Sequence, residues 1–278
     1  MRRLLPAALV LVAVSAAVAQ STPSTQPAAI PPGEEGAKAR LNSSPRHGEF
    51  IDITVPGRDK PVKAYIVYPE RADKAPVVIV TMEIFGLSDW LRGVTDQLAA
   101  DGFIAIAPDY LTGKGPNGGG TEAFPDRDSV VRAVQGVSTA DVIAINNAAR
   151  DYGMKLPAAS GKTASIGFCW GGGKSFAYAA AQPDLNAAVV YYGTPPADPE
   201  IAKIKCPVLA FYGAKDNRVT STEAPTAEKM KNLGKSFTPH IYDGAGHGFL
   251  RAQGDPANLK ASEEAWPLTI QFLRENTK

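Results

Sequence analysis

The stretch TASIGFCWGGG, residues 163–173, places Cys169 between a short, largely apolar run and a run of three glycines. The apolar run is typical of a strand buried on both faces, and the glycines open a helix. Gly-x-Cys-x-Gly is the pattern of a sharp strand-to-helix turn that holds a nucleophile at the start of the helix. Because a helix N-terminus stabilises negative charge, we expect this position to favour the thiolate of Cys169 over the thiol.

Working outward from this stretch, strand-like and helix-like segments alternate along the chain. Strands buried on both faces are expected at 76–83 and 103–110, further strands at 163–168, 187–193, 207–213 and 237–244, and an alternating, outer strand at 62–69. Helices are expected at 89–101 with Asp89 as N-cap, at 128–152 with a break near Gly136, and at 171–182, 222–233 and 257–275. This alternation predicts an α/β fold with a doubly wound, mostly parallel sheet and helices on both faces. Ligands bind such sheets beyond the carboxyl ends of the strands, where the glycine-rich, irregular segment 113–126 also lies.

The first residues indicate export. Residues 1–19 combine two arginines, an apolar run of about 15 residues, shorter than a membrane span, and small residues before Gln20. They predict a signal peptide, the alternative being an uncleaved anchor, and hence a periplasmic or secreted protein. Residues 20–46 are rich in Pro, Ser and Ala and predict a flexible leader, which leaves 47–278 as a single domain.

The charge balance excludes some partners. Without residues 1–19, which hold two arginines and no acidic residue, the chain has 27 basic and 28 acidic side chains. This balance argues against nucleic-acid binding and against a stable association with anionic membranes after cleavage. We expect a monomer that acts on a small molecule.

The two cysteines do not predict a disulfide. Cys169 follows an expected strand and Cys206 precedes one, so in a parallel sheet they lie at opposite edges, roughly 20 Å apart at ~3.3 Å per residue. A disulfide needs Cα atoms within about 7 Å of each other. We therefore expect Cys206 to be a packed core thiol and Cys169 to be free.

Candidate partners for Cys169 come from loops that follow later strands. His247 lies in the glycine-rich loop GAGHGFLR, whereas His47 falls in the leader and His240 inside a strand. Asp216 follows the strand 207–213, although it could instead cap a turn or helix. The chain order nucleophile, acid, base is that of the α/β-hydrolase triad.

A carboxylate also follows the strand 76–83. Glu83 directly after a buried strand costs several kcal/mol unless it is paired or protonated. It could cap the next helix, but we expect it near the thiol. The same loop supplies one oxyanion-hole amide in α/β-hydrolases, so we expect the backbone N–H groups of Ile84 and Trp170 to form an oxyanion hole.

The motifs MEIFGL, PDY, GFCWGGG, AVVYYG, YGAKDNRV and GAGHGFLR, in this order from about residue 50 to 275, resemble the dienelactone hydrolase family. The resemblance implies a Cys169–His247–Asp216 triad that hydrolyses an ester or lactone, in which Glu83 takes part in activating the thiol. It also implies that Glu83 exchanges partners with an arginine when an anionic substrate binds, and Arg251 matches that arginine. For a second substrate-binding arginine of the family, Arg127 and Arg132 are both candidates.

The resulting hypothesis is a hydrolase that cleaves a dienelactone-like, carboxylated ester or lactone through an acyl-thioester, with Arg251 binding the substrate carboxylate. It requires no metal and no organic cofactor. Two rivals remain: an exported small-molecule-binding protein that has lost catalysis, and a redox-active thiol protein. A peptidase is disfavoured because a thiolate is a good leaving group and an amine is a poor one.

Overall fold

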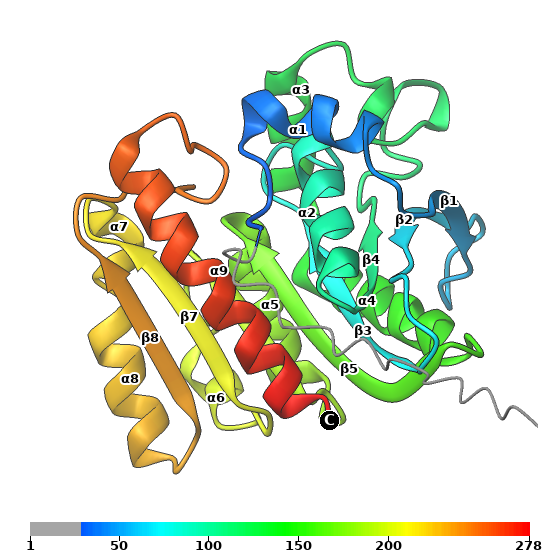
Figure 1. Cartoon of the computed structure of the whole chain (residues 1–278). Coiled ribbons are helices and arrows are strands. Elements are labelled where there is room, and N and C mark those ends of the chain that lie inside the picture. The colour runs from blue at the N-terminus through cyan, green and yellow to red at the C-terminus, as the bar shows by residue number, and fades with distance from the viewer. Residues whose placement is uncertain (1–28) are drawn as a thin grey trace, which may run out of the picture.

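An eight-stranded sheet forms the centre of the computed structural model, which describes residues 29–278 (Figure 1). Its strands are β1 (Gly48–Ile53), β2 (Val62–Val67), β3 (Ala75–Thr81), β4 (Ile104–Pro108), β5 (Ala159–Phe168), β6 (Ala187–Tyr191), β7 (Val208–Gly213) and β8 (Phe237–Tyr242). They lie in the order β1-β2-β4-β3-β5-β6-β7-β8, antiparallel at the first two pairings and parallel across the others. The predicted α/β-hydrolase fold, with a doubly wound and mostly parallel sheet, is confirmed.

Helices cover both faces of this sheet. The α-helices are α1 (Glu34–Asn42), α2 (Asp89–Ala100), α3 (Arg127–Gln135), α4 (Thr139–Met154), α5 (Trp170–Ala181), α6 (Asp198–Ile201), α7 (Asn217–Thr220), α8 (Glu223–Asn232) and α9 (Pro256–Asn276). In Figure 1, α2 and α9 lie on the near face, and α4, α5 and α8 lie behind the sheet. Trp266 of α9 donates a hydrogen bond to Asp101 at the end of α2 (3.0 Å), which ties the two near-face helices together. The central strands are buried on both faces, as their apolar runs predict.

Several local predictions differ from the structure. The segment 62–69 is not the outermost strand, because β1 pairs with β2 at the edge. Ser88, not Asp89, is the N-cap of α2, and its side chain accepts from the N–H of Leu91. The helix expected over 128–152 is two helices, α3 and α4, separated at the predicted break, Gly136. The glycine-rich segment 113–126 contains two 3-10 turns, η1 (Pro116–Gly118) and η2 (Thr121–Ala123).

The flexible leader predicted over residues 20–46 is wrong for its described part, 29–46. Residues 34–42 form α1, whose Ala37 is fully buried. Arg46 forms a salt bridge with the buried Asp96 of α2 (2.5 Å), and Ser44 donates to the same carboxylate (2.6 Å). Polar contacts and small residues hold this segment against α2. The amino-acid composition of the segment therefore did not indicate that it folds onto the domain. The signal peptide predicted at 1–19 lies outside the described residues. Among residues 29–278, no helix has the length and hydropathy of a membrane span.

The turn from β5 to α5 is crowded by backbone from two neighbouring segments. A Cβ on Gly167 would lie 1.9 Å from the carbonyl oxygen of Gly171, and a Cβ on Gly171 would lie 2.2 Å from that of Met82. A Cβ on Gly172 would lie 2.4 Å from the carbonyl oxygen of Tyr191 in β6. Backbone atoms cannot move aside as a flexible side chain can, so these positions accept only glycine.

The parallel register brings the loops after β5, β7 and β8 to one edge of the sheet. Phe168 at the end of β5 pairs with Tyr191 of β6, which pairs with Phe211 of β7. Gly213 at the end of β7 pairs with Tyr242 at the end of β8. Cys206 precedes β7 at the opposite edge, and both cysteines are free, as predicted.

Gly171→Ala should destabilise the fold, because its methyl group meets the Met82 carbonyl at the strand-to-helix turn. We expect a loss of about 1–3 kcal/mol in the free energy of unfolding, measured by urea denaturation. Gly36→Ala is the matched control, since a Cβ there meets nothing within 4 Å and alanine favours the helix α1. Equal stability of Gly171→Ala and the unmodified protein would contradict the steric account.

Candidate active site

Cys169 occupies a sharp turn between β5 and α5. Its backbone has φ 57° and ψ −118°, a left-handed conformation that costs a residue other than glycine on the order of 1–3 kcal/mol. The strain is offset by the pairing of β5 and the packing of α5 on either side. The turn holds the thiol at the N-terminal end of α5, as Gly-x-Cys-x-Gly predicts.

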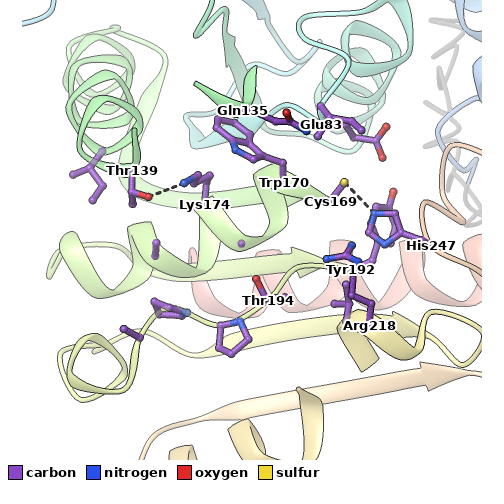
Figure 2. Close-up of a pocket in the computed structure, with 18 of the residues that line it drawn as sticks. Glu83, Gln135, Thr139, Cys169, Trp170, Lys174, Tyr192, Thr194, Arg218 and His247 are labelled. Atoms are coloured by element: carbon purple, nitrogen blue, oxygen red, sulfur yellow. Dashed lines mark hydrogen bonds between the residues drawn. The ribbon is translucent and has the colours of Figure 1, made fainter. Parts of the chain in front are cut away.

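The thiol meets the imidazole of His247 at this edge. The Sγ atom of Cys169 lies 3.0 Å from Nε2 of His247, and Figure 2 shows the two side chains pointing toward one another. On the other side of the ring, Nδ1 of His247 lies 2.5 Å from Oδ2 of Asp216. The structure thus joins three residues that are far apart in the sequence into one hydrogen-bonded chain.

The loops after β7 and β8 hold Asp216 and His247 in position. The side chain of Asp216 is only 7% exposed and makes no capping bond to α7, so the alternative role as a helix cap is wrong. Gly248, directly after His247, has φ +74°, which glycine adopts without strain. This turn returns the chain toward Arg251, whose N–H bonds to the Gly248 carbonyl (3.0 Å).

Glu83 lies at the same edge, but its partner in the structure is Arg251. The Nε of Arg251 donates to Oε2 of Glu83 (2.8 Å), and the Glu83 side chain is 3% exposed. Burial raises the pKa of Glu83 to about 7, although the charge of Arg251 opposes the shift. Burial therefore favours the protonated form of this carboxyl, and the ion pair with Arg251 favours the charged form.

The thiol of Cys169 is not a thiolate at rest, contrary to the expectation from its place at a helix N-terminus. Burial and the charge of Glu83 raise its pKa to about 11. The backbone N–H groups of Trp170 and Ile84 and the charge of Arg218 lower this pKa, but they do not outweigh burial. The two predicted oxyanion-hole amides thus both lie at the sulfur, where an oxyanion formed by attack would be near them.

These residues line a cavity of about 880 Å³. Trp170 and Lys174 of α5 line one side of it, and Lys174 bonds to Thr139 of α4 (2.6 Å) (Figure 2). Arg218 of α7 and Tyr192, which follows β6, also line the cavity. Sequence reasoning missed Lys174, Arg218 and Tyr192, although the motifs that contain Arg218 and Tyr192 were recognised and Lys174 directly follows GFCWGGG.

Tyr192 contacts two members of the site. Its ring packs edge-on against the ring of His247, with centroids 5.2 Å apart, and its φ is 39°. Burial and the nearby charges of Glu83 and Cys169 raise its pKa well above the usual value, so the phenol stays protonated. Its buried hydroxyl has no hydrogen-bond partner among residues 29–278.

Arg127 and Arg132, the two candidates for a second substrate-binding arginine, have different surroundings in the structure. Arg127, at the start of α3, lies over the ring of Phe85 and forms an ion pair with Glu34 of α1 (2.9 Å). Glu34 also forms an ion pair with Arg251, so that Arg127 and Arg251 share one carboxylate. Arg132 bonds instead to Ser129 on its own helix (3.3 Å).

The described residues contain no group of three or more His, Cys, Asp and Glu side chains that could hold a metal ion. The hydrogen-bonded acid, base and thiol, with backbone amides beside them, form the constellation of covalent acyl transfer.

The chain is similar to curated proteins over most of its length. The chain is 26% identical over 266 residues to an Escherichia coli (strain K12) protein named "Putative carboxymethylenebutenolidase", covering 90% of this chain and 96% of that protein. A Synechocystis protein of the same name is 29% identical over 242 residues, which cover 81% of this chain and 96% of the relative.

The fold also matches solved structures. A crystal structure from Klebsiella pneumoniae, described as "Putative Dienelactone Hydrolase", superposes with a TM-score of 0.71 at 25% identity, covering 83% of this chain and 99% of the other. The model of the dienelactone hydrolase family matches residues 62–277, most of the described chain. With the fold, this match establishes that the chain belongs to the dienelactone hydrolase family.

Proposed function

We propose that this protein is an exported hydrolase that cleaves an ester or lactone with the triad Cys169, His247 and Asp216. The observation that carries the proposal is the chain of contacts from sulfur to imidazole to carboxylate, 3.0 Å and 2.5 Å long, at the wall of a cavity. Membership of the dienelactone hydrolase family supports the reaction class.

In the proposed reaction, Cys169 attacks the carbonyl carbon of the substrate while its proton passes to Nε2 of His247. The carbonyl oxygen becomes an oxyanion that accepts hydrogen bonds from the backbone N–H groups of Ile84 and Trp170. The leaving oxygen takes the proton back from His247, and an acyl-thioester remains. Water, deprotonated by His247, then releases the acid and restores the thiol. Asp216 fixes the tautomer of His247 and stabilises its charged form.

The high pKa of the Cys169 thiol shapes this mechanism. A thiol with a pKa of about 11 stays protonated at neutral pH, so attack depends on proton transfer within the assembled site. Since the thiolate is the species that oxidants attack, the same shift protects Cys169 in an oxidising compartment. This disfavours the redox-active rival, as does the position of Cys206 at the opposite edge of the sheet.

Sulfur also limits the substrate class. Thiolates leave readily, so esters, enol lactones and thioesters, which carry better leaving groups than amides, suit this nucleophile. Whether the site can bind a substrate carboxylate depends on Arg251, whose guanidinium is bound by Glu83 and Glu34 in the structure. Glu83 is proposed to influence the thiol through its charge.

Export is proposed from the signal-peptide pattern of residues 1–19. Measuring the mass of the protein isolated from its host would show whether these residues are removed. The proposed partner is a small molecule, and the protein is proposed to act as a monomer without nucleic acid, membrane or cofactor.

Cys169→Ala should abolish hydrolysis of a neutral aryl ester such as phenyl acetate, because it removes the sulfur that contacts His247 and would form the acyl-enzyme. We expect kcat/KM to fall on the order of 10³-fold or more, measured by release of phenol. Cys206→Ala, at the opposite edge, should retain the kcat of the unmodified protein. If Cys169→Ala kept more than a tenth of the original rate, the proposed triad would be contradicted and a different nucleophile favoured. If the unmodified protein had no activity, a binding protein would be favoured.

Glu83→Gln should lower the pKa of the Cys169 thiol, because the negative charge of Glu83 raises it. Below its pKa a thiol is protonated, so in the unmodified protein alkylation by iodoacetamide should keep accelerating from pH 7 to beyond pH 10. In Glu83→Gln we expect the rate at pH 8 to rise roughly three- to tenfold. The measurement is the labelling rate of the Cys169 peptide by mass spectrometry, with Glu263→Gln on the exposed side of α9 as control. An unchanged pH profile would show that Glu83 does not act on the thiol.

A further inference from the structure

Glu34 joins the N-terminal segment to the active site. One carboxylate oxygen of Glu34 pairs with Nη1 of Arg251, and the other pairs with Nη1 of Arg127 (2.9 Å). Both guanidinium groups lie over the ring of Phe85, at 4.9 Å and 3.5 Å from its centroid. A single carboxylate therefore bridges two arginines across one aromatic side chain.

The position of Glu34 is fixed by backbone contacts as well as by charge. Its N–H donates to the carbonyl of Arg251 (2.9 Å), and the side chain of Gln253 donates to the carbonyl of Pro31 (3.0 Å). Ala37, one turn further along α1, is fully buried. The N-terminal segment is thus packed onto the loop that carries His247 and Arg251.

Arg251 lines the same cavity as Cys169 and His247, and Phe85 separates that cavity from a neighbouring one lined by Glu34 and Arg127. The guanidinium of Arg251 faces the carboxylates of Glu83 and Glu34, and that of Arg127 faces Glu34. Two positive and two negative charges leave this cluster neutral. A substrate carboxylate at Arg251 would add a third negative charge, or would have to displace Glu34.

We propose that Glu34 is a specificity-determining residue: it holds the place of a substrate carboxylate at Arg251, so that the part of the substrate beside Arg251 is uncharged. This inference rests on the proposed hydrolase function, whose substrate class it narrows to esters or lactones without a carboxylate at that end. Lys174 and Arg218 lie on α5 and α7, at other walls of the cavity. The inference reverses the expectation of a carboxylated substrate, because that expectation had Arg251 exchange Glu83 for the substrate and did not include a second carboxylate, Glu34, on the same guanidinium.

The most direct test compares two alkylating reagents of similar size at Cys169, of which one carries a carboxylate. Iodoacetate and iodoacetamide are each reacted with the unmodified protein and with Glu34→Gln, and the labelling rate of the Cys169 peptide is measured by mass spectrometry. We expect the ratio of the iodoacetate rate to the iodoacetamide rate to rise about tenfold in Glu34→Gln, since the subsite at Arg251 is then open to an anion.

Glu35→Gln is the matched control. Glu35 is exposed in the same first turn of α1, carries the same charge and makes no ion pair among the described residues. It should leave the ratio within twofold of the unmodified protein. Glu34→Asp keeps the charge and should remain nearer to the unmodified protein than Glu34→Gln does. An equal rise in Glu35→Gln, or no rise in Glu34→Gln, would overturn the inference.

Hydrolysis provides the second readout. The ratio of kcat/KM for the mono-phenyl ester of succinic acid to kcat/KM for phenyl acetate should rise about tenfold in Glu34→Gln, chiefly through a lower KM for the succinate ester. If the unmodified protein cleaves neither ester, the proposed function fails, and the alkylation ratio still decides the role of Glu34. If it cleaves phenyl acetate but Glu34→Gln gains nothing toward the succinate ester, the role of Glu34 fails and the proposed function stands.

Discussion

The left-handed backbone of Cys169 is the constraint on which the site depends. A residue with φ 57° between a strand and a helix reverses the chain within one position, so the thiol is held at the end of β5 with the N-terminus of α5 beneath it. The reversal brings backbone from α5 against backbone from β3 and β6, where only glycine fits. Two of the three consecutive glycines after Trp170, Gly171 and Gly172, are therefore explained by packing. The same packing aims the amides of Trp170 and Ile84 at the sulfur.

Around this turn, the charges are arranged so that the resting site is close to neutral. The buried carboxyl of Glu83 has a pKa of about 7 and the thiol of Cys169 a pKa of about 11, and in both cases burial is the main cause. Arg251 holds Glu83, and Glu34 in turn holds Arg251. A change at any one of these groups alters the next, which links the charge of the bound substrate to the reactivity of the thiol. The N-terminal segment is part of this network through Glu34.

Much of the fold and the triad follows from local sequence patterns. Buried parallel strands appear as continuous apolar runs, and residues after such strands must gather at one edge, so Cys169, Asp216 and His247 could be found without coordinates. The strand β1 carries an alternating pattern that continues to Val55, in which Ile51, Ile53 and Val55 pack against the core, and the prediction overlooked it. The helix α1 has one fully buried residue, Ala37, and carries no strong apolar period.

Side-chain partners were harder to predict than positions. The sequence indicated that Glu83 and Arg251 belong to the site, but whether Arg251 is free depends on Glu34, more than 200 residues away in the chain. The prediction that Cys169 is a thiolate was wrong for a related reason. The helix N-terminus was evident from the sequence, whereas the burial of the thiol and its distance from the charge of Glu83 depend on the tertiary structure. Arg218 lies within the motif YGAKDNRV and Lys174 directly follows GFCWGGG, but only the structure shows that both line the cavity.

The account rests on covalent chemistry at a single sulfur, and trapping the intermediate tests it most directly. The protein would be mixed with excess p-nitrophenyl acetate, quenched in acid within the first turnover and digested for mass spectrometry. The account predicts a burst of p-nitrophenol close to one equivalent per protein and an acetyl group on the peptide that contains Cys169. Steady turnover of the ester with an unmodified Cys169, or with the acetyl group on a different side chain, would contradict it.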